Sequence, residues 1–167
     1  MSAEISALRR APKVADGHLV LDDYLPYRLS VASNAVSRLI ARAYEDRFGL
    51  TIPQWRLIAV LAEDGPMTPG AAVARTAMDK VTISRAAQGL IRRRLLAREA
   101  HEADGRSHRL ALTDEGARLH AEIAPLALAY EAALLSGMTP GEVAAIKLLL
   151  GRLEAAAIRL SGDSPAS

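Results

Sequence analysis

A segment running from Asp79 to Arg93 mixes hydrogen-bonding and basic side chains with regularly spaced apolar ones. The polar members are Lys80, Thr82, Ser84, Arg85 and Gln88. The apolar members are Val81, Ile83, Leu90 and Ile91. Folded as a helix, the segment has one face to bury and one that offers donors and acceptors. Such a helix suits the major groove of duplex DNA, where base edges present a readable hydrogen-bonding pattern.

A basic arm follows this segment, over residues 98–113. Leu95–Ala100 and Arg109–Leu112 have the composition of two short antiparallel strands, and Asp104-Gly105-Arg106 is expected at the turn between them. A helix pair followed by a hairpin arm predicts a winged helix-turn-helix, a mainly α fold with a small β-wing.

The distribution of charge marks the same region. The formal net charge is only +2 at pH 7, but residues 75–112 hold nine basic and four acidic residues. Residues 1–74 are balanced, and residues 113–167 are net negative. A solvated charged face would explain the charge alone, but its coincidence with the helix and the arm favours contact with a polyanion.

Cap and breaker residues predict the helices that hold these parts in place. Six helices are expected, at about residues 26–48, 51–64, 68–75, 79–93, 113–135 and 139–160. The first follows the acidic start signals Asp22 and Asp23, and three others open on a threonine with a proline close behind it. Pro125 should bend the fifth helix.

The outer helices carry more apolar surface than a small winged domain can cover, as the stripe of Leu149, Leu150 and Leu153 illustrates. A symmetric dimer would bury this surface and set two recognition helices about 34 Å apart, although one larger monomeric core is an alternative. The expected domains are a flexible tail (1–20), a dimerisation helix that also lines part of a ligand pocket (21–50), the winged helix-turn-helix (51–116), C-terminal dimerisation helices (117–160) and a tail (161–167).

Composition excludes several classes of protein. There is no cysteine, no apolar run near the roughly 20 residues of a membrane span, and no apolar core in the first 13 residues, so we expect a cytoplasmic protein without membrane contact. The four histidines lack metal-ligand spacing, and neither a phosphate loop nor a nucleophile motif is present. We therefore expect no metal, no cofactor and no enzymatic activity.

From about Leu21 to Leu153 the chain resembles the multiple-antibiotic-resistance regulator (MarR) family of bacterial winged-helix repressors. The most specific part is residues 104–116, Asp-Gly-Arg-Ser-His-Arg-Leu-Ala-Leu-Thr-Asp-Glu-Gly, which match the family's wing signature. Residues 50–51, 54–55 and 78–85 match its second helix and its recognition helix. Each match is weak alone, but together and in order they are specific.

The resemblance implies a homodimer on a pseudo-palindromic operator in double-stranded DNA. The wing arginine, here Arg106, would enter the minor groove, and Asp104 would orient the arm through a salt bridge. An arginine at a hairpin tip also suits a narrow, electronegative groove. The full DNA-binding set that we expect is Thr68, Lys80, Val81, Thr82, Ser84, Arg85, Gln88, Arg98, Asp104, Arg106, Ser107, His108 and Arg109.

The chain departs from the family pattern at two positions. Ala77 and Arg94 stand where the family usually has glycine. A residue with a Cβ at positive φ costs on the order of 1 kcal/mol, so either the backbone is re-routed or the chain accepts the strain. Arg94 could add a phosphate contact.

The resemblance also implies an effector, because many MarR-like proteins release DNA when an aromatic acid or a related metabolite binds. Arg28 and Arg56 could bind the carboxylate of such an acid, and Trp55 could pack against its aromatic ring. The expected ligand-binding set is Tyr27, Arg28, Ser30, Asn34, Arg38, Trp55 and Arg56. Alternatively, Trp55 is plain core and the arginines form ion pairs.

The leading hypothesis is a sequence-specific repressor released by a small aromatic acid or its coenzyme A thioester. The alternatives are an architectural DNA binder indifferent to sequence, a constitutive repressor without a ligand, and a metabolite-binding protein that has lost DNA binding. Polar side chains beyond Lys and Arg favour sequence recognition, since phosphate contact needs only positive charge. The sequence leaves open the effector, the operator and the target genes, and whether individual promoters are activated or repressed.

Overall fold

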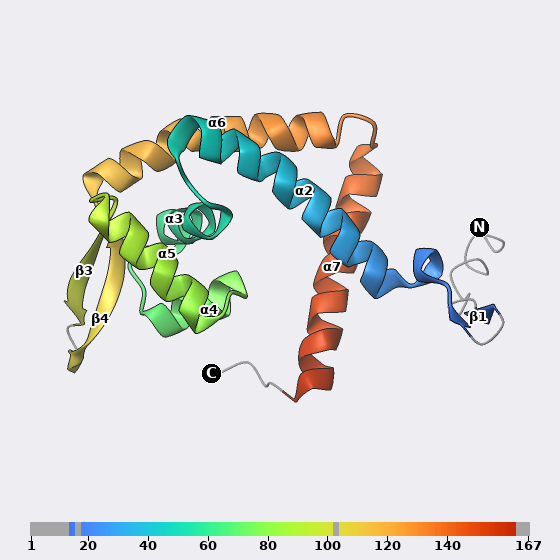
Figure 1. Ribbon diagram of the computed structural model, residues 1–167, viewed down its shortest axis with the longest axis horizontal. Coiled ribbons are helices and arrows are strands. Elements are labelled where there is room, and N and C mark those ends of the chain that lie inside the picture. The colour runs from blue at the N-terminus through green and yellow to red at the C-terminus, as the bar shows by residue number, and fades with distance from the viewer. Residues whose placement is uncertain (1–13, 16–17, 102–103, 163–167) are drawn as a thin grey trace. The chain divides into compact units, whose positions relative to one another are not determined.

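The computed structural model describes residues 14–15, 18–101 and 104–162, and it shows a mainly helical chain with two small antiparallel sheets (Figure 1). The predicted fold class is confirmed. In chain order the elements are β1 (Val14–Ala15), β2 (His18–Leu19), the 3-10 helix η1 (Leu21–Asp23), α2 (Leu25–Phe48), α3 (Ile52–Asp64), α4 (Pro69–Thr76), α5 (Lys80–Arg92), β3 (Leu96–His101), β4 (Asp104–Leu112), α6 (Asp114–Leu134) and α7 (Pro140–Ser161).

Cap residues begin the helices where they are predicted to. The Thr51 hydroxyl accepts a hydrogen bond from the Gln54 backbone N–H, and the Gln54 side chain accepts one from the Thr51 N–H, which forms a capping box for α3. Thr68 caps α4 and Thr139 caps α7 in a similar way. The start of α2 differs, because Asp22 lies in η1 and no side chain caps the helix.

The N-terminal part of the chain contains a strand pairing that the sequence does not predict. β1 and β2 pair within the region predicted as a flexible tail. Residues 1–13 of that tail lie outside the described residues.

The chain forms two compact units that divide between Ile123 and Ala124. In the first unit α3, α4 and α5 pack on one another, and the β3–β4 hairpin lies against α5 and α3, as Figure 1 shows. Its fully buried large side chains are Tyr44, Leu50, Leu57, Ile58, Ile83, Leu90, Leu110 and Ile123. Because Ile83 and Leu90 are locked into this core, the opposite face of α5 must point outward.

The second unit holds the C-terminal part of α6 and all of α7. Lys147 of α7 pairs with Glu131 of α6, at 3.5 Å between Nζ and Oε1. No residue of α7 is buried, and apolar side chains such as Leu148 and Leu149 are half or more exposed. Pro125 lies inside α6, directly after the division between the units.

At both positions where the chain departs from the family pattern, the backbone is strained and not re-routed. Ala77 ends α4 at φ 53° and Arg94 follows α5 at φ 59°, both in the left-handed region. The Thr113 hydroxyl donates to the Arg94 carbonyl oxygen at 2.7 Å, which helps to hold that conformation. The chain therefore keeps the backbone route that glycine would take and accepts a cost of about 1 kcal/mol at each position.

Candidate nucleic-acid interface

The N-terminal turn of α5 is fixed by Asp79. Its Oδ1 accepts from the Thr82 backbone N–H at 2.8 Å, and its Oδ2 accepts from the Thr82 hydroxyl at 2.6 Å. Both bonds lower the pKa of Asp79, and the bond from the Thr82 hydroxyl has the larger effect. Since the Thr82 hydroxyl already donates its proton to Asp79, it has only acceptor capacity to offer a base.

The outward face of α5 carries six exposed side chains: Lys80, Val81, Ser84, Arg85, Gln88 and Arg92. Ser84, Gln88 and Arg92 are four residues apart, so they lie along one side of the helix. Arg92 is absent from the predicted set, although its spacing from Gln88 is a signal that could have found it. Val81, which the sequence pattern groups with the apolar residues, is exposed rather than buried.

The wing differs from its prediction at the turn. β3 and β4 pair regularly from Leu96 with Leu112 to Ala100 with His108. The register then breaks, because His101 pairs with Asp104 and three residues of β4 lie between the two pairs. Asp104 thus begins β4, and the chain does not turn about Gly105. The side chains of Asp104, Arg106 and Ser107 lie outside the described residues, so their predicted roles stay predictions.

Among the described side chains of the positive region, three basic residues have partners within the protein. Arg75 pairs with Asp64 and Glu63, and the Arg93 guanidinium donates to the carbonyl oxygens of Gly49 and Phe48. Arg109, which belongs to the predicted DNA-binding set, donates to the Pro66 carbonyl oxygen. A charge count alone therefore overstates the positive charge that this face can offer to DNA.

Thr68 also has a structural role. Its hydroxyl accepts from the Ala71 backbone N–H at 3.2 Å as the cap of α4. The preceding residue, Met67, exchanges two backbone hydrogen bonds with Leu110 of β4, at 3.1 and 2.8 Å. The start of α4 is therefore tied to the wing.

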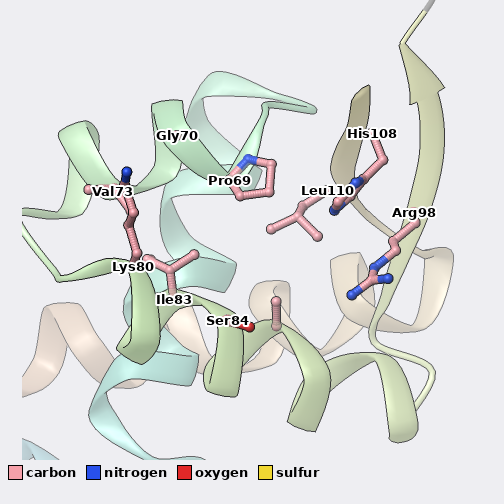
Figure 2. Close-up of a pocket in the computed structure, with 10 residues that line it drawn as sticks. Pro69, Gly70, Val73, Lys80, Ile83, Ser84, Arg98, His108 and Leu110 are labelled. Atoms are coloured by element: carbon pink, nitrogen blue, oxygen red, sulfur yellow. The ribbon is translucent and has the colours of Figure 1, made fainter. Parts of the chain in front are cut away.

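A pocket of about 290 Å³ opens between α4, α5 and the wing (Figure 2). Its lining residues are Pro69, Gly70, Val73, Lys80, Ile83, Ser84, Ala87, Arg98, His108 and Leu110. Figure 2 shows the Arg98 and His108 side chains reaching from the wing strands into the space above α5. Four of the predicted DNA-binding residues, Lys80, Ser84, Arg98 and His108, thus meet around one cavity, which the sequence pattern does not predict.

The predicted ligand-binding residues fall into two groups. Tyr27, Arg28, Ser30, Asn34 and Arg38 are exposed on α2, whereas Trp55 is half-buried on α3 with Arg56 exposed beside it. Trp55 packs against Tyr44, with 5.0 Å between ring centroids, and Tyr44 stands 17 residues after Tyr27 on the same helix. A helix rises about 1.5 Å per residue, so roughly 25 Å separates Tyr27 from the Trp55 end of α2. One chain therefore does not bring Tyr27 and Trp55 into a shared pocket.

Two neighbours of Trp55 were not predicted. Trp55 also stacks on His120 of α6, at 5.7 Å between ring centroids and 14° between ring planes. Trp55 thus contacts two aromatic rings of the protein but is only half-buried, so it is not the plain core residue of the alternative interpretation. Arg28 pairs with Asp22, at 3.6 Å between Nη1 and Oδ1, and both side chains are well exposed.

None of the described helices is both long and apolar enough to cross a bilayer. Within the same part of the chain, no three potential metal-ligating side chains come together.

Comparisons with known proteins give a consistent result. A family model described as the MarR family matches residues 48–107. The transcriptional regulator MgrA of Staphylococcus aureus is 26% identical over 133 residues, which cover 80% of this chain and 89% of MgrA.

Two solved structures are similar over most of the chain. A probable transcriptional regulator from Pseudomonas aeruginosa is 29% identical, with a TM-score of 0.73 and coverage of 80% of this chain and 99% of its own. BpsR of Bordetella bronchiseptica, whose DNA binding is regulated by 6-hydroxynicotinic acid, is 26% identical, with a TM-score of 0.76 and coverage of 83% and 98%.

Proposed function

Because the chain belongs to the MarR family of DNA-binding transcriptional regulators, which are not enzymes, we propose that it is a dimeric repressor of a pseudo-palindromic operator. It acts on bacterial DNA in the cytoplasm. α5 of each protomer lies in a major groove, and the wing, with Arg106 near its tip, reaches the adjacent minor groove. The observation that carries this proposal is the outward face of α5, on which Ser84, Gln88 and two arginines are all exposed.

A second copy of the chain is the partner that α7 requires. In a single chain, α7 exposes Ile146, Leu148, Leu149, Leu150 and Leu153 to water. Burial of such surface is worth about 25 cal/mol per Å², which favours a homodimer in which these leucines meet a symmetry-related surface. The dimer also supplies the two recognition helices that a pseudo-palindrome needs.

The effector that we propose is an aromatic acid, or the acyl part of its coenzyme A thioester. The pocket between α5 and the wing suits such a molecule, because Pro69, Val73 and Leu110 can pack on a ring and Lys80 and Arg98 can pair with a carboxylate. The regulation of BpsR by 6-hydroxynicotinic acid supports this chemical class.

Release of DNA follows from competition for the same cations. A carboxylate held by Arg98 would occupy a cation that is otherwise available to a phosphate, so the effector has different affinities for free and DNA-bound protein. A tenfold loss of operator affinity needs about 1.4 kcal/mol, which one charge-assisted contact can supply. The surface around Trp55 and Arg56 is a second candidate site, but Tyr27 and Arg28 could join it only from another chain.

The test is selection of bound duplexes from a random pool, repeated in the presence of a panel of aromatic acids and thioesters. We expect a pseudo-palindromic sequence to be enriched and at least one acid to release it. Enrichment of no sequence would point to an architectural DNA binder. An operator that no acid releases would leave a constitutive repressor.

The site of the effector is tested by filling the pocket. Val73→Phe places a larger side chain among the apolar lining residues and changes no cation. We expect this variant to bind operator normally and to lose its response to the acid. An unchanged response would show that the effector binds at another site. A parallel Arg56→Ala variant would show whether that site is near Trp55.

A further inference from the structure

Val81 is an anomaly on the outward face of α5. Its side chain is 58% exposed, and it is the one large apolar residue of this fully described helix that faces water to such an extent. Its exposed neighbours on the helix are Lys80, Ser84 and Arg85. Several leucines of α7 are exposed close together on one helix, where a second copy can cover them, but Val81 stands alone among polar groups.

The surrounding structure fixes the position of Val81. Ile83 and Leu90 are buried and hold the rotation of α5. The two hydrogen bonds from Thr82 to Asp79 hold its first turn. Valine is β-branched and has a restricted χ1, so its two methyl groups point in a defined direction.

Val81 also shares the face of the polar side chains proposed to read DNA. Ser84, Arg85 and Gln88 follow it at three, four and seven residues, which is the spacing of one helical face. A valine cannot hydrogen-bond a phosphate or a base edge. In the major groove, thymine offers an apolar group, its C5 methyl, that such a side chain can cover.

We propose that Val81 packs against the C5 methyl of a thymine in each operator half-site and so helps to determine the sequence that the protein binds. This inference rests on the proposed function, in which α5 lies in the major groove. It adds a preference for one base through burial of apolar surface, in contrast to the hydrogen bonds of Ser84 and Gln88.

Replacement of thymine by deoxyuridine tests the proposal, because it removes the methyl group and leaves every hydrogen-bonding group in place. Each thymine of the selected operator is replaced in turn, together with its symmetry mate, and affinity is measured for wild type and for Val81→Ala. At one position we expect wild type to lose about fourfold per half-site, as burial of one methyl group suggests. Val81→Ala should bind the two duplexes equally.

A matched control separates this effect from a general loss of affinity. Ser84→Ala alters the same face and should keep the wild-type preference for thymine at that position. Melting temperatures equal to wild type confirm that both variants fold. If wild type binds every deoxyuridine duplex as tightly as the operator, or if Val81→Ala keeps the thymine preference, the inference is overturned and the proposed function stands. If no duplex is enriched at all, the proposed function fails and this inference fails with it.

Discussion

The Arg93 guanidinium donates a hydrogen bond from Nη1 to the carbonyl oxygen of Gly49 at 2.8 Å. A second bond runs from Nη2 to the Phe48 carbonyl oxygen at 2.9 Å. Both acceptors lie at the C-terminal end of α2, where unpaired carbonyls and the helix dipole favour a cation. Arg93 therefore joins α5 to α2, whereas its neighbour Arg92 remains exposed at the end of the outward face.

Adjacent alanine substitutions should separate these two roles. We expect Arg93→Ala to lower the free energy of unfolding by about 1 kcal/mol in urea titration, because it removes two charge-assisted bonds. Arg92→Ala should leave unfolding unchanged but weaken DNA binding for all sequences, with a salt slope smaller by about one unit. The reverse pattern would contradict this division of roles.

Ala77→Gly should stabilise the protein by about 1 kcal/mol, since glycine adopts the observed φ of 53° without strain. Thermal unfolding of Ala74→Gly is the matched control. Ala74 lies in the regular part of α4, where glycine should instead cost about 0.5–1 kcal/mol. A destabilised Ala77→Gly variant would argue that the left-handed conformation at this turn is not strained.

Gly116→Ala should destabilise the first unit by about 3 kcal/mol or unfold it. A Cβ at this position would lie 2.1 Å from the Leu95 carbonyl oxygen, and backbone there cannot move without disturbing the wing. Gly70→Ala is the control, because its added Cβ would meet nothing closer than 3.9 Å. Equal unfolding midpoints for the two variants would show that α6 can shift away from the Leu95 carbonyl oxygen.

Asp79 should make stability depend on pH in the acid range. Its pKa is lowered in the folded protein by the bonds from Thr82, so the unfolded chain takes up the proton more readily. The stabilisation is thus fully present above the ordinary pKa of 3.8 and is lost as the pH falls through the lower folded value.

Asp79→Asn is the comparison, since asparagine can still cap the helix but has no carboxylate to titrate. Urea unfolding at several pH values should show that wild type loses more stability than the variant between neutral pH and pH values below 3.8. If the free energy of unfolding falls equally with pH in the two proteins, Asp79 does not contribute to the loss of stability in acid.

The helix boundaries are predictable from the sequence because they depend on chemistry between near neighbours. Thr51 and Gln54 meet within one turn, and so do Asp79 and Thr82. At Ala77 the sequence leaves two outcomes open, a re-routed backbone or a strained one, and the observed φ of 53° shows the strained one. The exposed polar side of α5 follows from helical periodicity.

Features that depend on distant partners are beyond such prediction. Arg93 has its acceptor 44 residues earlier, so a charge count assigns it to the DNA-binding face. The pocket above α5 exists only because the wing folds back toward α4, and the turn of the wing is displaced by a break in strand register. The predicted ligand site combines Tyr27 with Trp55 because the sequence does not show that Trp55 of α3 packs on Tyr44, at the end of α2 that lies about 25 Å from Tyr27.

The most direct test of sequence-specific binding through α5 is an equilibrium titration of the selected operator and a scrambled duplex of equal length, at several salt concentrations. We expect wild type to bind the operator at least about 10³-fold more tightly than the scrambled duplex, with both affinities falling as salt rises. Gln88→Ala should reduce that ratio, whereas Arg92→Ala should weaken both complexes alike. Equal wild-type affinity for the two duplexes, or a ratio that Gln88→Ala leaves unchanged, would contradict recognition of the operator by the outward face of α5.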